Sequence, residues 1–161
     1  MSGRSIKAGV KTLLLETLPP LEGGGQRQIL ERYPRTIDNS KGDVIVLWMR
    51  RGKEERFAGS GRNNGGAMQG VKRLYWDCRI DVIKWGQDIE GDYDAFEDLV
   101  DEIMSICRRN NTLGGYQAPD GTQVLNFGEW MDLESFEPQY ARQFLRYQSS
   151  IHVTVEEIYN A

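Results

Sequence analysis

The sequence has 161 residues, about the length of one domain, and its 39% of hydrophobic residues is too high for an intrinsically disordered chain. Lys and Arg number 20 against 24 Asp and Glu, and the net charge of -4 argues against attraction of the whole domain to nucleic acid phosphates. Two cysteines exclude a disulfide framework, and a Cys/His zinc site would need the single histidine, His152, together with Cys78, Cys107 and a carboxylate.

The first predicted element is an amphipathic helix near the N-terminus. Its apolar stripe has the 3.6-residue period of a helix and consists of Ile6, Val10, Leu13, Leu14 and Thr17. We expect Ser5 to cap this helix and the Pro19-Pro20 pair to end it. Residues 26–39 carry no clear pattern. No apolar run approaches the length of a membrane span or follows the N-terminus as a signal peptide would, so we expect a soluble, cytoplasmic protein without a membrane partner.

Two strands are predicted next. Residues 43–49 (DVIVLWM) are rich in β-branched and aromatic residues and predict a strand buried on both faces near its centre, while residues 56–58 are expected to begin a partner strand. A glycine-rich loop at about residues 58–70 should form an exposed hairpin tip. From Leu74 to Val82 apolar residues alternate with polar ones, which predicts a long half-buried strand. Its polar face holds Tyr75, Asp77, Arg79 and Asp81.

The second half of the chain predicts another helix and two more strands. The helix has an apolar stripe from Phe96 to Cys107, Asp92 or Asp94 as its N-cap, and Arg108-Arg109 at its end. Residues 123–127 predict a strand, and the alternation around Ile151 predicts a final one. The order is roughly α-β-β-α-β-β. The fold class is therefore α+β, one domain over residues 1–161, with a mostly antiparallel sheet and two helices packed on one face.

The motifs that carry chemistry are weak. Gly59, Gly61 and Gly65 miss the dinucleotide spacing by one residue and precede a strand, where that motif opens a helix. The acidic run from Asp88 has its glycine at the fourth position, whereas a calcium loop of the EF-hand type needs it at the sixth. His152 lies in an alternating strand, and no nucleophile-elbow sequence accompanies it. We therefore expect no enzyme, no catalytic residue, no cofactor and no metal ligand.

Charge is distributed unevenly along the chain. Residues 50–73 hold seven Lys and Arg against two Glu, and residues 88–102 hold eight Asp and Glu and no cation. These segments are either two solvated faces or complementary surfaces of neighbouring subunits, a contact that closes naturally into a ring. Trp48 and Trp76 are expected in the core, with Trp85 and Trp130 as interface anchors at strand ends. The candidate interface residues are Arg50, Arg51, Arg56, Arg62, Asp88, Asp92, Asp94, Trp85 and Trp130.

The order and character of these segments resemble a known family. An amphipathic N-terminal helix, a strand pair with a long polar loop over residues 50–70, and a sheet strand over residues 74–85 come first. A helix with the acidic start YDAFEDL (residues 93–99) and a final strand IHVTV (residues 151–155) follow. The whole resembles the tail terminator (tail completion) proteins of long-tailed bacteriophages.

The resemblance implies a structural virion protein of the tail and neck, assembled in the host cytoplasm. Members of that family have an α/β fold and form hexameric rings at the head-proximal end of the tail tube, where they end polymerisation and face the neck connector. By this resemblance, residues 59–70 reach a neighbouring subunit or the tube protein. Residues 88–102 face a neighbour or the channel, where acidic groups keep passing DNA from sticking. A connector adaptor or head-closure protein and a small ligand-binding or regulatory α+β module are the alternatives.

Overall fold

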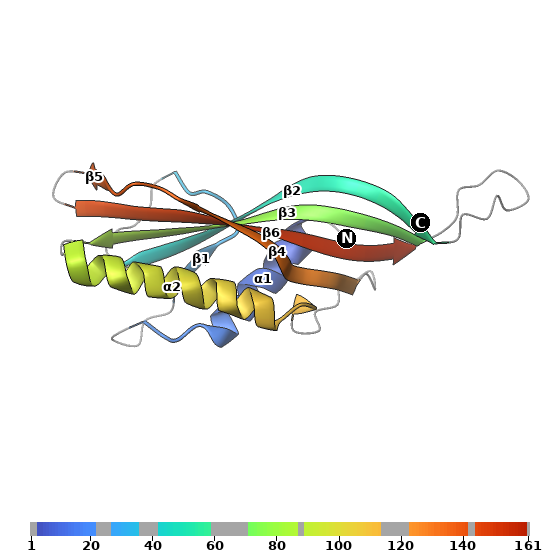
Figure 1. Cartoon of the computed structure of the whole chain (residues 1–161), viewed down its shortest axis with the longest axis horizontal. Helices are drawn as coiled ribbons and strands as arrows, with labels where there is room; N and C mark the ends of the chain where they lie inside the picture. Colours follow the sequence, from blue (N-terminus) through green and yellow to red (C-terminus); the bar gives the residue numbers. More distant parts are fainter. Residues whose placement is uncertain are drawn as a thin grey trace, which may run out of the picture.

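The computed structural model describes residues 3–21, 27–35, 42–58, 71–86, 89–113, 123–141 and 144–160. Two helices and one six-stranded sheet make up this part of the chain (Figure 1). The elements are α1 (Gly3–Thr17), β1 (Gln28–Leu30), β2 (Asp43–Ala58), β3 (Val71–Gly86), α2 (Ile89–Arg109), β4 (Gln123–Ser135), β5 (Gln139–Ala141) and β6 (Phe144–Asn160). The α+β class is confirmed.

The sheet is mostly antiparallel, as predicted. Its strand order is β1-β2-β3-β6-β4, and β5 pairs with β6 beyond the end of β4. Only β1 runs parallel to its neighbour among these pairs. The predicted order lacked β1 and β5, because strands of three residues are too short to show a period. The prediction that residues 56–58 begin a partner strand was wrong: β2 continues to Ala58, and its partner is β3.

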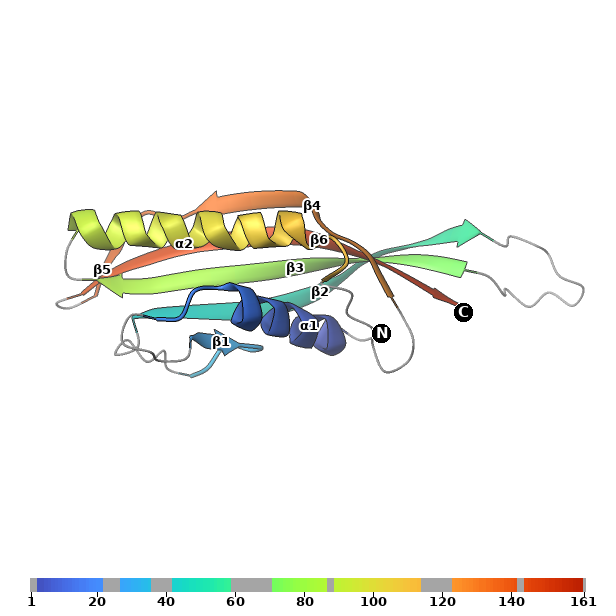
Figure 2. The same ribbon diagram turned by 90° about the horizontal axis from the view of Figure 1, so that it is seen from below.

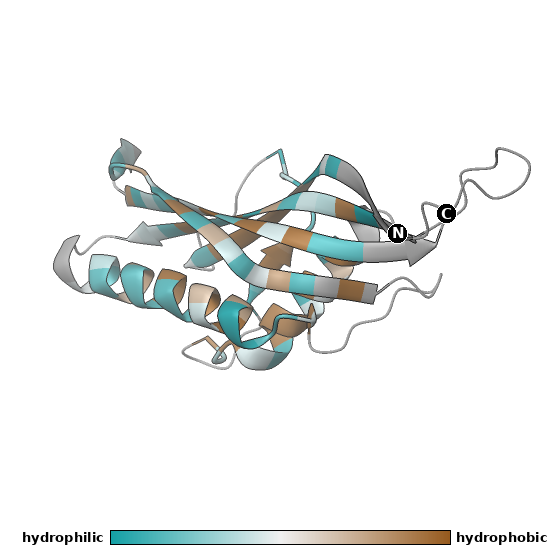
Figure 3. Cartoon of the chain, turned by 45° about the vertical axis from the view of Figure 1, so that its right-hand side comes forward, coloured by the Kyte–Doolittle hydropathy of each residue, from teal (hydrophilic) through white to brown (hydrophobic). Residues whose placement is uncertain are grey.

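Both helices cover the same face of the sheet (Figure 2). The stripe of α1 from Ile6 to Leu14 and the stripe of α2 from Phe96 to Cys107 are buried in one core cluster. Alternate residues of the strands, such as Leu47, Cys78, Ile80 and Ile151, close that core from the other side. Figure 3 shows the resulting alternation of hydrophilic and hydrophobic bands along the strands and around α2.

The predicted helix starts were wrong. Helix α1 begins at Gly3, so Ser5 lies inside it, and α2 begins at Ile89, so Asp92 and Asp94 lie in its first turns. An apolar stripe marks where burial begins, and the helical backbone extends beyond that point. The Pro19-Pro20 stop and the basic end of α2 are confirmed.

The side of the sheet away from the helices is here called the second face. Near β1 it is apolar and closed, because Val44, Val46 and Ile83 are fully buried, which confirms that the start of β2 is buried on both faces. Farther along β2, Trp48 is 39% exposed on this face. Its predicted place in the core was wrong, because Leu47 and Met49 point to the helices and the pleat turns the residue between them the opposite way.

Strands β2, β3 and β6 extend past the helices and form an arm (Figures 1 and 2). The ladder between β2 and β3 continues to the pair Ala58 and Val71, so residues 59–70 connect the two strands of a hairpin. The glycine-rich loop predicted there lies outside the described residues. None of the described helices is long and apolar enough to cross a membrane.

Candidate functional site

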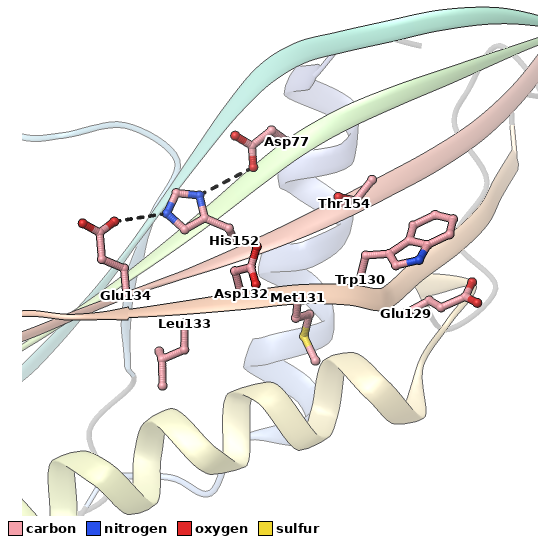
Figure 4. Close-up of a pocket in the computed structure, with 9 residues that line it drawn as sticks. All are labelled: Asp77, Glu129, Trp130, Met131, Asp132, Leu133, Glu134, His152 and Thr154. Atoms are coloured by element: carbon pink, nitrogen blue, oxygen red, sulfur yellow. Dashed lines mark ion pairs between the residues drawn. The ribbon is translucent and has the colours of Figure 1, made fainter.

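A polar cluster around His152 occupies the middle of the second face. The imidazole lies between two carboxylates from the neighbouring strands (Figure 4): its Nδ1 is 3.7 Å from Oδ1 of Asp77 on β3, and its Nε2 is 3.5 Å from Oε2 of Glu134 on β4. Arg50 of β2 donates a 3.4 Å hydrogen bond to the other oxygen of Asp77. The predicted exposed position of His152 is confirmed in part, since a third of its side chain is accessible. One line of polar, titratable side chains therefore crosses all four long strands.

A second group of contacts lies beside this cluster. The guanidinium of Arg79 is 4.8 Å from the centroid of the Trp48 ring, within the range of a cation–π interaction. Its Nε is also 3.2 Å from Oδ1 of Asp81, to which Ser150 donates a 2.5 Å hydrogen bond. Burial raises the pKa of the Asp81 carboxyl above its ordinary value, and the Ser150 hydrogen bond and nearby His152 lower it only in part. The polar face predicted for β3 is confirmed, but Asp81 on it is buried.

The His152 cluster lines a shallow hollow of about 680 Å³ (Figure 4). Its wall contains four carboxylates and one imidazole, with Trp130, Met131 and Leu133 as apolar members. Such a surface suits a cationic partner better than an anionic one. The described residues contain no group of three or more His, Cys, Asp or Glu that could hold a metal ion. The hydroxyl of Thr154 lines the same wall and would be the possible nucleophile there. In the described contacts it makes no hydrogen bond to His152, so the His152 and Asp77 pair has no nucleophile held beside it.

A bulge in β4 shapes this hollow. Phe127 pairs with Val155 and Met131 pairs with Val153, so the β4 strand has two more residues than β6 over this stretch. Gly128, at a φ of 84°, makes the turn possible. The bulge leaves Trp130 47% exposed beside the cluster, in the middle of β4. The prediction that Trp130 stands at a strand end was therefore wrong.

Exposed apolar side chains also gather in residues 130–140, with Trp130 on the His152 side of β4, Leu133 directed toward α2 (Figure 4), Phe136 just after β4 and Tyr140 in β5. Leu133, Phe136 and Tyr140 are exposed by 44, 42 and 79%, and with Trp130 they form most of the large exposed hydrophobic side chains of the described chain. Four carboxylates lie among them in sequence: Glu129, Asp132, Glu134 and Glu137. We call residues 129–140 the acidic apolar edge. The sequence prediction missed it, although residues 123–141 contain no Lys or Arg, a signal that was available.

The predicted interface residues are spread over the molecule. Arg50 and Arg51 are exposed in the middle of β2, and Asp92 and Asp94 lie on the first turns of α2. Trp85 is at the end of β3 as predicted, but it is half-buried with the Arg146 guanidinium 5.6 Å from its ring centroid. The side chain of Arg56 and the whole of Arg62 and Asp88 lie outside the described residues. Among the described members of this set, only Trp130 and Arg50 come close to the His152 cluster.

Comparisons with known proteins leave the function open. No protein-family model matches the chain, and no curated protein matches it. Among the solved structures that match, one aligns over 98% of this chain and 94% of its own length, with 14% sequence identity and a TM-score of 0.49. A likeness at that level carries no argument about function.

Proposed function

We propose that this chain is a structural virion protein that forms a ring at the head-proximal end of a phage tail tube. The ring ends polymerisation of the tube and joins the tail to the neck connector. The resemblance in element order supports this proposal, and it supplies the hexamer as the expected ring. Its partners are further copies of itself, the tail tube protein, and a connector or head-closure protein.

The acidic apolar edge is the observation that carries the proposal. Several large exposed apolar side chains within one short segment of the chain, residues 130–140, are unusual on a monomer and typical of a surface that another protein covers. These residues lie at a sheet edge, where Trp130 and Leu133 line the wide hollow and Leu133 and Phe136 line a smaller one of about 180 Å³. Their large combined exposed surface favours a protein partner over a small substrate. The helix-free arm gives the chain a second surface suited to assembly.

The experiment is assembly on tail tubes. Purified protein is added to tail tubes that lack it, and their ends are imaged by electron microscopy. The proposal expects rings at one end of the tubes and an end to tube growth in the presence of free tube protein. Bare ends and unchanged growth contradict it. Rings found on connector-bearing heads and absent from tubes support the connector adaptor instead.

The hollow beside His152 favours a second candidate, a small ligand-binding module. Its carboxylates and Trp130 would hold a cationic ligand. A ligand that binds only the folded chain raises its melting temperature by mass action. A panel of metal ions, polyamines and nucleotides tests this candidate in a thermal-shift assay. A rise with one compound that Glu134→Gln abolishes supports it, and an unchanged melting temperature across the panel rejects it.

A further inference from the structure

Both long edges of the sheet lack a strand partner in the described chain. On one side, β4 pairs only with β6. On the other side, β1 covers β2 only at residues 44–46, so from Leu47 to Ala58 no strand of the described chain lies on the side of β2 away from β3. Free edges of this length are templates for pairing with another chain, and natural proteins usually shorten or cover them.

The two free edges carry opposite charges. From Leu47 to Ala58 the β2 edge holds four Lys and Arg against Glu54 and Glu55, and its Arg50, Arg51 and Lys53 are exposed. The β4 edge presents Glu129, Asp132 and Glu134, also exposed, with no Lys or Arg between residues 123 and 141. Opposite charges across paired strands stabilise the pair, and like charges oppose it. Each edge is therefore suited to the other and unsuited to a second copy of itself.

The edges cannot meet within one chain. They lie on opposite sides of the sheet, with β3 and β6 between them. Strand direction alternates from β2 through β3 and β6 to β4, since these three pairs are antiparallel. A rotation about an axis along the strands thus places β2 of a second copy antiparallel to β4 of the first. Such a contact joins two different surfaces, and it repeats from copy to copy until a ring closes.

We propose that the acidic apolar edge of one copy pairs with the β2 edge of the next copy by strand addition, so that one continuous sheet extends across the subunits. Main-chain hydrogen bonds join the strands, and the opposite charges fix which edges pair. Trp130 and Leu133 lie beside the joint, where the incoming strand covers part of their exposed surface. This inference rests on the self-association in the proposed function, and it replaces the acidic start of α2 as the partner of the basic segment.

Two charge-reversed chains test the pairing. In the first, Asp132→Lys with Glu134→Lys changes the net charge of strand β4 from −3 to +1, so the strands at both edges are basic. In the second, Arg51→Glu with Lys53→Glu makes both edges acidic. Each chain alone should stay a single-chain species, by light scattering, at concentrations where the wild type assembles. An equal mixture should regain the wild-type mass, because each basic edge then finds an acidic one on the other chain. This rescue also shows that both variants are folded.

A matched reversal on the helix serves as the control. Asp94 and Asp98 are exposed on α2, and Asp94→Lys with Asp98→Lys changes the charge by the same amount as the β4 variant. This chain should assemble like the wild type. The inference is overturned if the two edge variants assemble alone, if their mixture stays unassembled, or if the helix variant is the one that loses mass. A wild type that stays a single chain in solution and on tail tubes contradicts the proposed function itself.

Discussion

Gly128 of β4 lies directly against the main-chain carbonyl of Cys107 in the last turn of α2. Its φ of 84° is in the left-handed region, and a Cβ atom there would collide with that carbonyl oxygen. The glycine therefore lets the bulged strand approach the helix closely. The same bulge leaves Trp130 exposed beside His152, so one backbone position links the core to the candidate interface.

Replacing Gly128 by alanine should destabilise the fold strongly. The substitution adds a backbone penalty and a collision, and we expect a loss of more than about 2 kcal/mol in the free energy of unfolding. Gly42→Ala is the matched control, because Gly42 has a φ of 80° but nothing within 4 Å of its Cβ position. Gly42→Ala should lower the free energy of unfolding by about 1 kcal/mol. Urea unfolding of both variants measures the difference, and equal losses would show that the contact with Cys107 carries no energy.

Two tryptophans should respond in opposite ways. Trp130→Ala removes an exposed ring, so it should change the unfolding free energy of the chain by less than about 0.5 kcal/mol while weakening assembly. Trp76→Phe should destabilise the chain by about 1 kcal/mol or more, because the indole Nε1 donates a 3.1 Å hydrogen bond to the buried Glu157 carboxylate. If a stable Trp130→Ala chain assembles at the same concentrations as the wild type, the Trp130 ring is not part of the interface.

The buried carboxyl of Asp81 should make stability depend on pH. Its pKa is raised by burial, so the ionised form is less favourable in the folded chain than in the unfolded chain. This unfavourable contribution is present at neutral pH and is lost as the pH falls through the raised pKa. Asp81→Asn keeps the acceptor for Ser150 but cannot ionise.

The free energy of unfolding, measured in urea from pH 7 to pH 4, tests this sign. The stability of Asp81→Asn relative to the wild type should be greatest at pH 7 and should decline toward acid pH. A relative stability that rises toward acid pH would mean that the folded chain favours the ionised carboxylate.

Neither cysteine should react in the folded protein. Cys78 and Cys107 are buried free thiols, and burial raises the pKa of Cys107 to about 12 and raises that of Cys78 as well. The nucleophilic thiolate is therefore scarce at pH 8. A thiol reagent such as iodoacetamide should modify both thiols only in urea. Tyr140→Cys, at a position 79% exposed, is the positive control and should be labelled once without urea. Rapid labelling of Cys78 or Cys107 in native buffer would contradict their burial.

The sequence predicted those parts of the fold that a local period determines. The buried stripes of α1 and α2 and the alternation of β3 and β6 follow from residues that share one face. In a fully apolar stretch, the sequence does not show which face of the sheet a given side chain points to, because no alternating polar residue marks the two faces. Trp48 in the run from Asp43 to Met49 is the example.

Most of the candidate site depends on strand register, which one sequence does not contain. Glu134 and Asp77 meet at His152 only because β4 and β3 flank β6 in this alignment. The bulge at Gly128 shifts β4 by two residues and decides which side chains face that cluster. The charge asymmetry was visible in the sequence, but the structure adds a second acidic segment, at residues 129–137, on an open sheet edge.

The mass of the wild-type protein, measured by light scattering over a range of concentrations and in the presence of tail tubes, tests the central claim most directly. The account predicts a closed species of several copies, six by the resemblance, in solution or at the tube end. A chain that remains a monomer at every concentration and leaves the tube ends bare would contradict it.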